Sequence, residues 1–362
     1  MIRFADLLRS IYRRNGQVVF AAPSAFASRM YGLHPLARKY FAYIDKLLLF
    51  PLFLLLSARS FDLVHIADHG NAFYSFCIPR GRCIVTCHDL LAVRGAMGDA
   101  SAFCEASPIG IWLQRLIMAG LRHAAAVAFD SQSTFQDYQR LIANPPAQRQ
   151  AVIPIPLNAP FNSDSTFFSL TPAEVAQIPQ APYLLMVGSS HPRKNRTLAL
   201  QLLEHLGPSS PYMVVFAGAP LTVAHQTFRA CHPLGDRLIS IEEPSHALLN
   251  RLYCQAHALL FPSFAEGFGW PLVEAQTCSC PVIASTTTSI PEVAGEGALY
   301  ADPTDVASFA DHVRALEDPT ERAKLIASGI NNTRRYDADV VSDAYRRFAF
   351  ELTISSVSIP RP

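Results

Sequence analysis

Two glutamates eight positions apart, Glu266 and Glu274, flank a glycine-rich turn. The turn follows an apolar run at 258–261 that ends in Pro262 like a buried strand leaving its sheet, and Pro271 stands where a helix can begin. A turn between a strand and a helix is where open α/β sheets bind ligands. The spacing therefore predicts a site in which the two carboxylates contact different parts of one elongated ligand.

The turn itself, Gly267-Phe268-Gly269, permits close approach of the backbone because glycine has no Cβ. The helix N-terminus beyond it favours a negatively charged group. A ligand that suits these features is polar, rich in hydroxyls and phosphorylated. A glutamate beside a glycine turn is, taken alone, more often a solvated loop carboxylate, so the prediction depends on a second block of residues.

The second block repeats the order of strand, loop and helix. An apolar run at 183–187 continues into Gly188, and a helical pattern follows at 197–206. Arg193 and Lys194 stand in the intervening loop, with Asn195 placed to cap the helix. Two cations and free backbone amides are therefore expected to meet where a diphosphate can lie.

Residues 266–275 resemble the donor-site signature of retaining glycosyltransferases of family 4, a motif written E-G-F-G-x-P-x-x-E-A, with every named position filled. Residues 187–195 resemble that family's V-G-x-x-x-P-R-K-N segment, whose basic pair contacts the nucleotide diphosphate of the donor. Some members carry a further arginine after the first glycine, where this chain has Ser189. A smaller departure is Ser279, where glycine is common.

The resemblance implies an α/β fold of the GT-B type, in which two Rossmann-like domains face each other across a cleft. It implies that Glu266 holds sugar hydroxyls and that Glu274 holds the ribose. It also implies that configuration is retained by front-face attack, with the leaving phosphate as the base. The implied catalytic residues are Glu266, His88, Arg193 and Lys194, and the implied donor-binding residues are Gly188, Arg193, Lys194, Glu266, Gly267, Phe268, Gly269 and Glu274.

His88 and Asp89 follow an apolar run at 84–86 and are expected to project from the carboxyl end of a strand. A lone histidine there is more often structural, whereas family members place a histidine-containing loop near the donor sugar or the acceptor hydroxyl. His65 and Asp68 are lesser candidates on the neighbouring strand end. No Asp-x-Asp pair stands in a suitable loop, so we expect no metal and no cofactor other than the nucleotide diphosphate sugar, with GDP-mannose favoured.

A chain of 362 residues exceeds one ordinary core and predicts two domains. We expect an acceptor-side domain at 1–165, a nucleotide-sugar domain at 180–336, and a closing helix and tail at 337–362. The closing helix carries an apolar stripe that can pack on the first domain. The predicted strands cover 18–21, 63–66, 83–87, 126–129 and 151–155 and then begin near 183, 213, 238, 258 and 281, and the stripe is Val341, Ala344, Phe348 and Phe350.

The first residues read as a helix, whereas family members open with a strand and a glycine-rich turn. The first strand and glycine loop are therefore expected to be missing. Two explanations stay open: a start site placed too late, or a protein that is inactive because its acceptor site is incomplete.

Charge divides unevenly, with 16 Lys or Arg against 10 Asp or Glu in residues 1–165, and 14 against 19 afterwards. A basic first domain suggests an anionic partner, such as a lipid-linked phosphate or a membrane surface. The apolar stretch 47–56 is shorter than the roughly 20 residues of a bilayer span, and Pro51 interrupts it. We expect a core helix there, with interfacial insertion beside Arg38, Lys39, Lys46 and Arg59 as the less favoured alternative.

Scattered cysteines and the lack of a secretory signal predict reduced core thiols and residence in the cytoplasm, extending to the inner face of the plasma membrane if the membrane is contacted. The predicted function is transfer of a hexose, with mannose favoured, to a glycan or lipid-linked acceptor in bacterial surface polysaccharide and lipopolysaccharide synthesis. No contact with nucleic acid is expected. Two alternatives remain: a non-catalytic binding relative, and a sugar-nucleotide epimerase of the same architecture.

Overall fold

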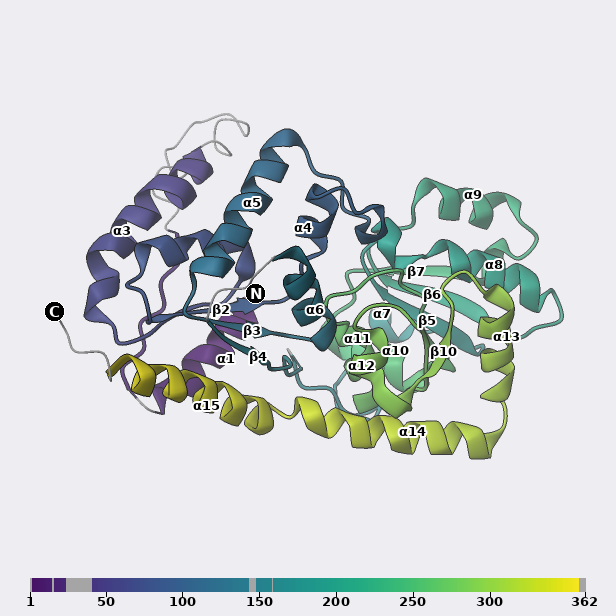
Figure 1. Cartoon of the computed structure of the whole chain (residues 1–362). Coiled ribbons are helices and arrows are strands. Elements are labelled where there is room, and N and C mark those ends of the chain that lie inside the picture. Colours follow the sequence, from purple (N-terminus) through teal and green to yellow (C-terminus); the bar gives the residue numbers. More distant parts are fainter. Residues whose placement is uncertain (1, 15, 24–40, 143–147, 158, 358–362) are drawn as a thin grey trace.

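The computed structural model describes residues 2–14, 16–23, 41–142, 148–157 and 159–357. Two parallel β-sheets dominate these residues, one at each end of the molecule (Figure 1). The first sheet has four strands in the order β1-β2-β3-β4, and the second has six in the order β10-β9-β8-β5-β6-β7. Helices cover the sheets, as parallel sheets with helical crossovers require.

The amino-terminal sheet is built from short apolar strands. Three of them lie where the sequence predicts them, because runs such as 126–129 are buried on both faces. The fourth begins and ends two to three residues earlier than predicted, since Pro154 has no N–H with which to continue the ladder. The strands are β1 (Val64–Ile66), β2 (Cys83–Cys87), β3 (Ala126–Phe129) and β4 (Arg149–Val152).

The strand predicted at 18–21 is wrong. Within the described residues, this stretch has no strand hydrogen bonds to either sheet. Val19 and Phe20 are exposed, so the stretch lacks the two-sided burial that its apolar composition indicated. The helices of this half are α1 (Ile2–Arg13), α3 (Phe50–Ser57), α4 (Leu91–Ala96), α5 (Pro108–His123) and α6 (Gln132–Leu141), with the 3₁₀ segment η4 (His69–Cys77).

The carboxyl-terminal sheet follows the predicted strands closely, with β10 as an additional edge strand. Its strands are β5 (Tyr183–Gly188), β6 (Met213–Gly218), β7 (Leu238–Glu242), β8 (Ala258–Phe261), β9 (Val282–Ser285) and β10 (Leu299–Ala301). Its helices are α7 (Pro172–Val175), α8 (Thr197–Leu206), α9 (Val223–Cys231), α10 (His246–Gln255), α11 (Trp270–Thr277), α12 (Ile290–Ala294), α13 (Val306–Ala315) and α14 (Pro319–Thr333).

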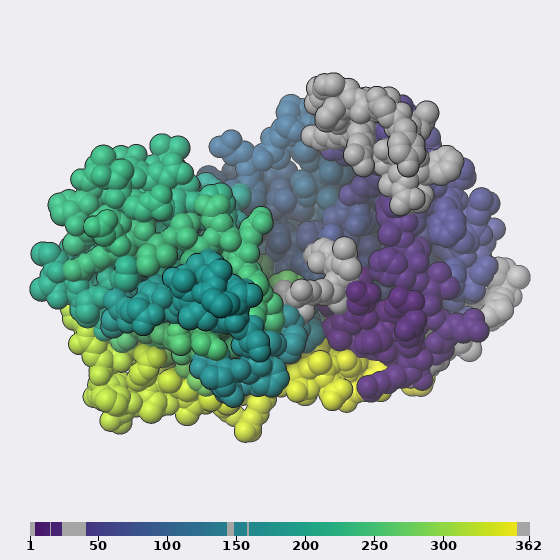
Figure 2. All heavy atoms as spheres, turned by 180° about the vertical axis from the view of Figure 1, so that it is seen from behind, coloured from purple at the N-terminus to yellow at the C-terminus, as the bar shows by residue number. Residues whose placement is uncertain are grey.

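The last helix, α15 (Ala338–Val357), returns from the second sheet to the first. The carboxyl-terminal helices, coloured yellow, run along the lower edge of both halves of the molecule (Figure 1). The view from the opposite side shows the same yellow segment below both halves (Figure 2). Val341 and Phe348 are buried, and the Tyr345 ring of the same helix lies 5.9 Å from the Phe4 ring of α1, so this helix packs on the first domain as predicted. Phe350 was assigned to the same stripe and is 60% exposed, so that part of the prediction is wrong.

The apolar stretch predicted as a core helix is helical but not core. It belongs to a continuous helical run, Phe41–Ser60, which is long and apolar enough to cross a membrane by length and composition. Most of its leucines are exposed, whereas Leu54 and Ala58 are buried. The expectation that it is too short for a span is therefore also wrong, because the helix extends beyond the apolar run at both ends.

All eight cysteines are free thiols. Cys83, Cys87, Cys278 and Cys280 are buried, whereas Cys231 is exposed and is not a core thiol.

Candidate functional site

Strand pairing brings the two predicted loops together. β5 and β8 are neighbours and parallel, with Leu184 opposite Ala258 and Leu185 opposite Leu259. The loops that leave their carboxyl ends therefore lie at the same edge of the sheet. One loop carries Arg193 and Lys194, and the other carries Glu266, so residues 73 positions apart in sequence become neighbours.

Glu266 is held between the two cations. Lys194 Nζ lies 2.6 Å from Glu266 Oε1, and the Arg193 guanidinium pairs with Oε2 and also donates to the Ala265 carbonyl at 2.9 Å. The Glu266 residue is only 6% exposed. Burial alone raises the pKa of this carboxyl, but the charges of Lys194 and Arg193 outweigh burial and hold it below its ordinary value. Glu266 is therefore ionised at neutral pH.

Hydrogen bonds hold the loop around Glu266 in place. The Glu266 N–H donates to the Thr288 hydroxyl at 2.9 Å. The Ser289 hydroxyl can donate to either of two backbone carbonyls, that of Glu266 at 3.0 Å and that of Phe268 at 3.1 Å. Phe268 itself is buried, with its ring 5.5 Å from that of Tyr336, so only its backbone can face a ligand. The predicted role of Phe268 in donor binding is one of its backbone, and its side chain belongs to the core.

Glu274 lies on α11 and is buried like Glu266, but nothing neutralises it to the same degree. The Tyr253 hydroxyl donates to Glu274 Oε2 at 2.8 Å. Burial raises the pKa of Glu274 to about 7, against the smaller opposing effects of Tyr253 and Lys194. Sequence reasoning missed Tyr253, because its place in the apolar pattern of α10 reads as core packing.

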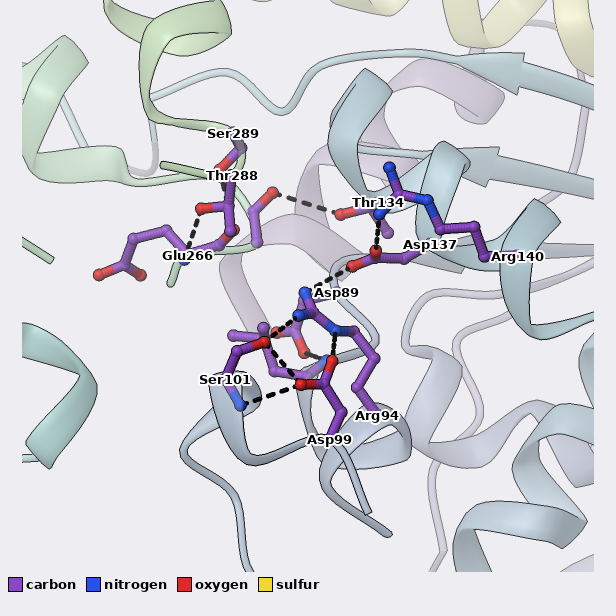
Figure 3. A network of polar contacts seen from close by, with 12 residues as sticks. Asp89, Arg94, Asp99, Ser101, Thr134, Asp137, Arg140, Glu266, Thr288 and Ser289 are labelled. Atoms are coloured by element: carbon purple, nitrogen blue, oxygen red, sulfur yellow. Dashed lines mark hydrogen bonds and ion pairs between the residues drawn. The ribbon is translucent and has the colours of Figure 1, made fainter. Parts of the chain in front are cut away.

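Gly267 is required by the approach of the two domains to each other. A Cβ there would lie 2.4 Å from Asp89 Cβ and 2.7 Å from the His88 carbonyl oxygen. The Ser131 hydroxyl donates to the Gly267 carbonyl at 2.8 Å, and the Thr134 hydroxyl also reaches it at 3.3 Å. Figure 3 shows Glu266, Thr288 and Ser289 on one side of this junction, with Asp89 and Thr134 on the other.

Both other glycines of the predicted site adopt backbone conformations that suit glycine, whereas Asn195 does not have its predicted role. Gly269 precedes α11 with a φ of 104°, and Gly188 ends β5 with a φ of 120°, a region that glycine adopts readily. Asn195 was expected to cap α8, but Arg196 occupies the N-cap position. The Asn195 amide instead donates to the carbonyls of Pro262 and Pro303, which fixes the cationic loop to its neighbours.

His88 has both ring nitrogens engaged within its own domain. Nδ1 lies 2.5 Å from Asp130 Oδ2, and Nε2 lies 2.9 Å from the Ala67 carbonyl oxygen. Both partners accept hydrogen bonds, so the ring satisfies them only when both nitrogens carry protons. Burial lowers the pKa of His88, but the Asp130 charge and hydrogen bond outweigh burial and raise the pKa to about 9. His88 can therefore supply positive charge, but it is not free to accept a proton.

The two lesser candidates have structural partners. His65 stands between the Tyr12 hydroxyl at 2.7 Å and the Thr86 hydroxyl at 2.8 Å, which ties α1 to β1 and β2. Asp68 accepts the Gly70 N–H at 2.8 Å and caps η4. Sequence reasoning missed His69, whose Nδ1 accepts the His88 N–H at 3.3 Å.

A further contact across the domains was also missed. The Glu292 carboxylate, at the start of α12, accepts the N–H groups of Gln132 at 2.7 Å and Ser133 at 3.2 Å. These are free donors of the first turn of α6, so a carboxylate from the other domain satisfies them. In the sequence, Pro291-Glu292 reads only as the start of a local helix.

Arg94 fixes the position of α6 from the side of its own domain. It donates to Asp99 at 2.8 Å, to Ser101 at 2.8 Å and to Asp137 of α6 at 3.1 Å (Figure 3). This network joins α4 to α6 and presents the N-terminus of α6 to the second domain.

Residues 171–332 match the model of the family described as glycosyl transferases group 1. O-antigen chain mannosyltransferase B of Escherichia coli is 40% identical over 89 residues, which are 24% of this chain and 23% of that protein. O-antigen chain mannosyltransferase RfbU of Salmonella typhimurium is 32% identical over 157 residues, which are 43% of this chain and 44% of that protein. The matches thus span less than half the length of these curated relatives.

Solved structures confirm the predicted fold. Sucrose-phosphate synthase of Thermosynechococcus elongatus aligns with a TM-score of 0.69 and 18% identity over 94% of this chain and 87% of that one. HepE of Anabaena, solved with UDP and glucose, aligns with a TM-score of 0.63 and 15% identity over 84% of this chain and 82% of that one. The chain therefore has the GT-B fold, carries a glycosyl transferases group 1 domain at residues 171–332, and resembles bacterial mannosyltransferases.

Proposed function

We propose that this chain transfers a hexose, with mannose as the first candidate, from a nucleotide diphosphate sugar to a glycan or lipid-linked acceptor in surface polysaccharide synthesis. The observation that carries the proposal is the grouping of Arg193, Lys194 and Glu266 at the carboxyl edge of the second sheet. Two cations and one carboxylate leave one net positive charge at the place where parallel sheets bind ligands.

The charges at this site suit the departure of a diphosphate. Transfer of a sugar places negative charge on the leaving phosphates, and cations fixed beforehand stabilise that charge without reorganisation. Arg193 and Lys194 share one carboxylate, so a diphosphate competes with Glu266 for both of them. As the cations turn to the phosphates, the Glu266 oxygens become free to accept hydrogen bonds from sugar hydroxyls.

The remaining residues take supporting roles in this proposal. Glu274 accepts a ribose hydroxyl, which favours its ionised form. His88 places positive charge beside the acceptor side of the site, and Asp130 holds its ring in one orientation. We propose retention of configuration with the leaving phosphate as the base, so that no side chain acts as nucleophile and no metal is required.

The choice of mannose rests on the mannosyltransferase relatives and not on a residue of this chain. We propose a guanosine diphosphate donor together with mannose. We also place the reaction in the cytoplasm, which keeps thiols reduced, and the eight free cysteines are consistent with that compartment.

The proposal is tested with a panel of nucleotide diphosphates and their mannose, glucose and galactose derivatives, measured by calorimetry and then by product analysis with candidate acceptors. We expect one base to bind tightly and Lys194→Ala to weaken its binding by about a hundredfold. Lys324→Ala, at an exposed lysine of α14, is the matched control and leaves binding unchanged.

Each of the other outcomes supports a different function. A folded wild type that binds no sugar nucleotide contradicts the donor site. Binding without transfer to any acceptor supports the non-catalytic alternative, and release of an epimerised sugar nucleotide without an acceptor supports the epimerase. An inverted anomeric configuration in the product, read by NMR, overturns retention.

A further inference from the structure

The outer face of the helical run Phe41–Ser60 is an exposed apolar surface. We call the exposed side chains between Tyr43 and Leu56 the apolar helix surface. Leu48 is 63% exposed and Leu56 is 77% exposed, and Leu52, Phe53 and Leu55 are each about half exposed. An ordinary surface helix turns charged residues outward, whereas this one turns leucines outward. A contiguous apolar patch of this kind marks an interaction site.

The opposite side of the same helix is fastened to the first domain. Leu54 and Ala58 are buried, and the Phe50 ring packs edge-on against the Tyr74 ring at 5.0 Å. The Tyr74 hydroxyl donates to the Lys46 carbonyl at 2.9 Å. These contacts hold the helix along the surface of the domain. The helix can therefore insert its outer face into the interface of a bilayer, but it cannot span the bilayer without detaching from the domain.

Basic residues border the apolar helix surface at both ends. Lys46 stands near its start, with its ammonium 5.9 Å from the centre of the Phe73 ring. Arg59 and Arg82 lie near its end, where the Arg82 guanidinium donates to the Phe61 carbonyl at 3.1 Å and to the Arg59 carbonyl at 3.4 Å. Arg80 is exposed two residues before Arg82. The exposed Asp62 lies beside them and offsets part of this charge. Lysine and arginine around an apolar helix face suit the interface of a bilayer that contains anionic lipids.

We propose that the apolar helix surface docks the chain on an anionic phospholipid bilayer, with the helix lying in the interface and its cations at the headgroups. The helix backbone is already hydrogen-bonded internally, so it enters the interface without unpaired peptide groups. The exposed leucines meet the acyl boundary, and the fastened side stays on the domain.

The position of this surface also bears on the acceptor, a consequence that rests on the proposed function. A cavity of about 1440 Å³ lies between α1, α3 and the edge strand β1. Its lining includes Phe53 and Leu54 of the helix and also Ala67, whose carbonyl lies 2.9 Å from His88 Nε2. The cavity therefore extends from the apolar helix to Ala67, which lies after β1 and contacts His88. An acceptor carried on a lipid would reach the site from this side.

The test is sedimentation of the purified full chain with sucrose-loaded vesicles of phosphatidylglycerol and phosphatidylethanolamine, compared with vesicles of phosphatidylcholine. We expect the wild type to bind the anionic vesicles, and Leu52→Glu with Leu56→Glu to reduce the partition coefficient more than tenfold. Val223→Glu with Val340→Glu is the matched control, because both valines are exposed apolar residues on other elements, and this variant binds like the wild type.

Arg59→Gln with Arg80→Gln tests the charge. Each lost cation is expected to reduce binding to anionic vesicles by about fivefold, with no change on neutral vesicles. Circular dichroism and thermal unfolding confirm that the variants are folded. The vesicle test therefore depends neither on nucleotide binding nor on transfer activity.

A wild type that stays in solution with anionic vesicles overturns the proposal. Equal binding by the wild type and the leucine variant overturns it as well. Concentration-dependent self-association that disappears in the leucine variant, without vesicle binding, assigns the surface to a second copy of the chain instead.

Discussion

Lys194 Nζ lies 2.6 Å from Glu266 Oε1, so the cation expected to bind a donor phosphate and the carboxylate expected to bind its sugar contact each other directly. Arg193 occupies the other oxygen of the same carboxylate. Donor binding is therefore expected to replace these ion pairs with contacts to the donor. A substitution of Glu266 changes how the two cations bind phosphate, and a substitution of either cation changes the environment of Glu266.

Replacement of Glu266 is expected to separate binding from turnover. Glu266→Gln removes the carboxylate that competes with phosphate, so the nucleotide diphosphate without sugar should bind as tightly as to the wild type or up to about tenfold tighter. Transfer should fall by about a hundredfold or more, because the hydrogen bonds to the sugar weaken in the transition state. Calorimetry and initial rates on the same preparation measure both effects. Binding that weakens as much as it does in Lys194→Ala would contradict this exchange.

Glu274 is expected to make stability depend on pH. Burial raises its pKa from 4.5 to about 7, so the folded state holds this proton more tightly than the unfolded chain does. The free energy of unfolding should therefore decrease as pH rises from about 4.5 to 7, and Glu274→Gln should remove that decrease. Relative to wild type, the variant gains up to about 3 kcal/mol between pH 4 and pH 8, measured by urea unfolding. A constant difference across this range would contradict the buried carboxyl.

Asp130 is expected to control the charge of His88. Burial alone lowers the pKa of His88, and Asp130 raises it to about 9, so Asp130→Asn should bring the pKa below the ordinary value of 6.5. In the wild type, the stabilisation from this pair is complete below pH 6.5 and is lost as pH rises through 9. NMR titration of the His88 ring measures the shift. A His88 that still titrates near pH 9 in the variant would show that Asp130 is not its partner.

A methyl group at Gly267 is expected to part the domains. Gly267→Ala places a Cβ within 2.4 Å of Asp89 Cβ, which no small side-chain movement relieves. Transfer should fall by about tenfold or more, whereas the nucleotide diphosphate, bound by the second domain, should keep its affinity. Small-angle scattering should show a larger radius of gyration. Gly110→Ala, whose added Cβ makes ordinary contacts at 3.4 Å, is the control.

Ser279 is expected to carry backbone strain that glycine removes. It follows α11 with a φ of 57°, in the left-handed region that glycine adopts without steric cost. Ser279→Gly should raise the free energy of unfolding by about 0.5–1 kcal/mol, measured by denaturant titration. Ser279→Ala keeps the strain and should give no gain. A loss of stability in the glycine variant would mean that the serine side chain stabilises the turn.

Sequence reasoning was most accurate where one local property decides the structure. Buried parallel strands such as 183–188 and 258–261 are continuous apolar runs, and the loops after them carry the charged residues of the site. The same rule failed at 18–21 and for the apolar stretch 47–56. Both segments have the composition of buried elements but are exposed, and composition does not state what a segment packs against.

Local sequence determined the strand, loop and helix units and the kinds of chemistry that their loops carry. Tertiary structure decided which of these residues meet. The His88–Asp130 pair and the Glu292 contact with α6 join residues 42 and 160 positions apart, and the clearance at Gly267 is set by the other domain. The first of these contacts depends on the pairing of β2 with β3 in one sheet, and the other two depend on how the two separate sheets are placed. A motif of about ten residues specifies its own backbone, but it contains no information about the surface that the rest of the chain brings against it.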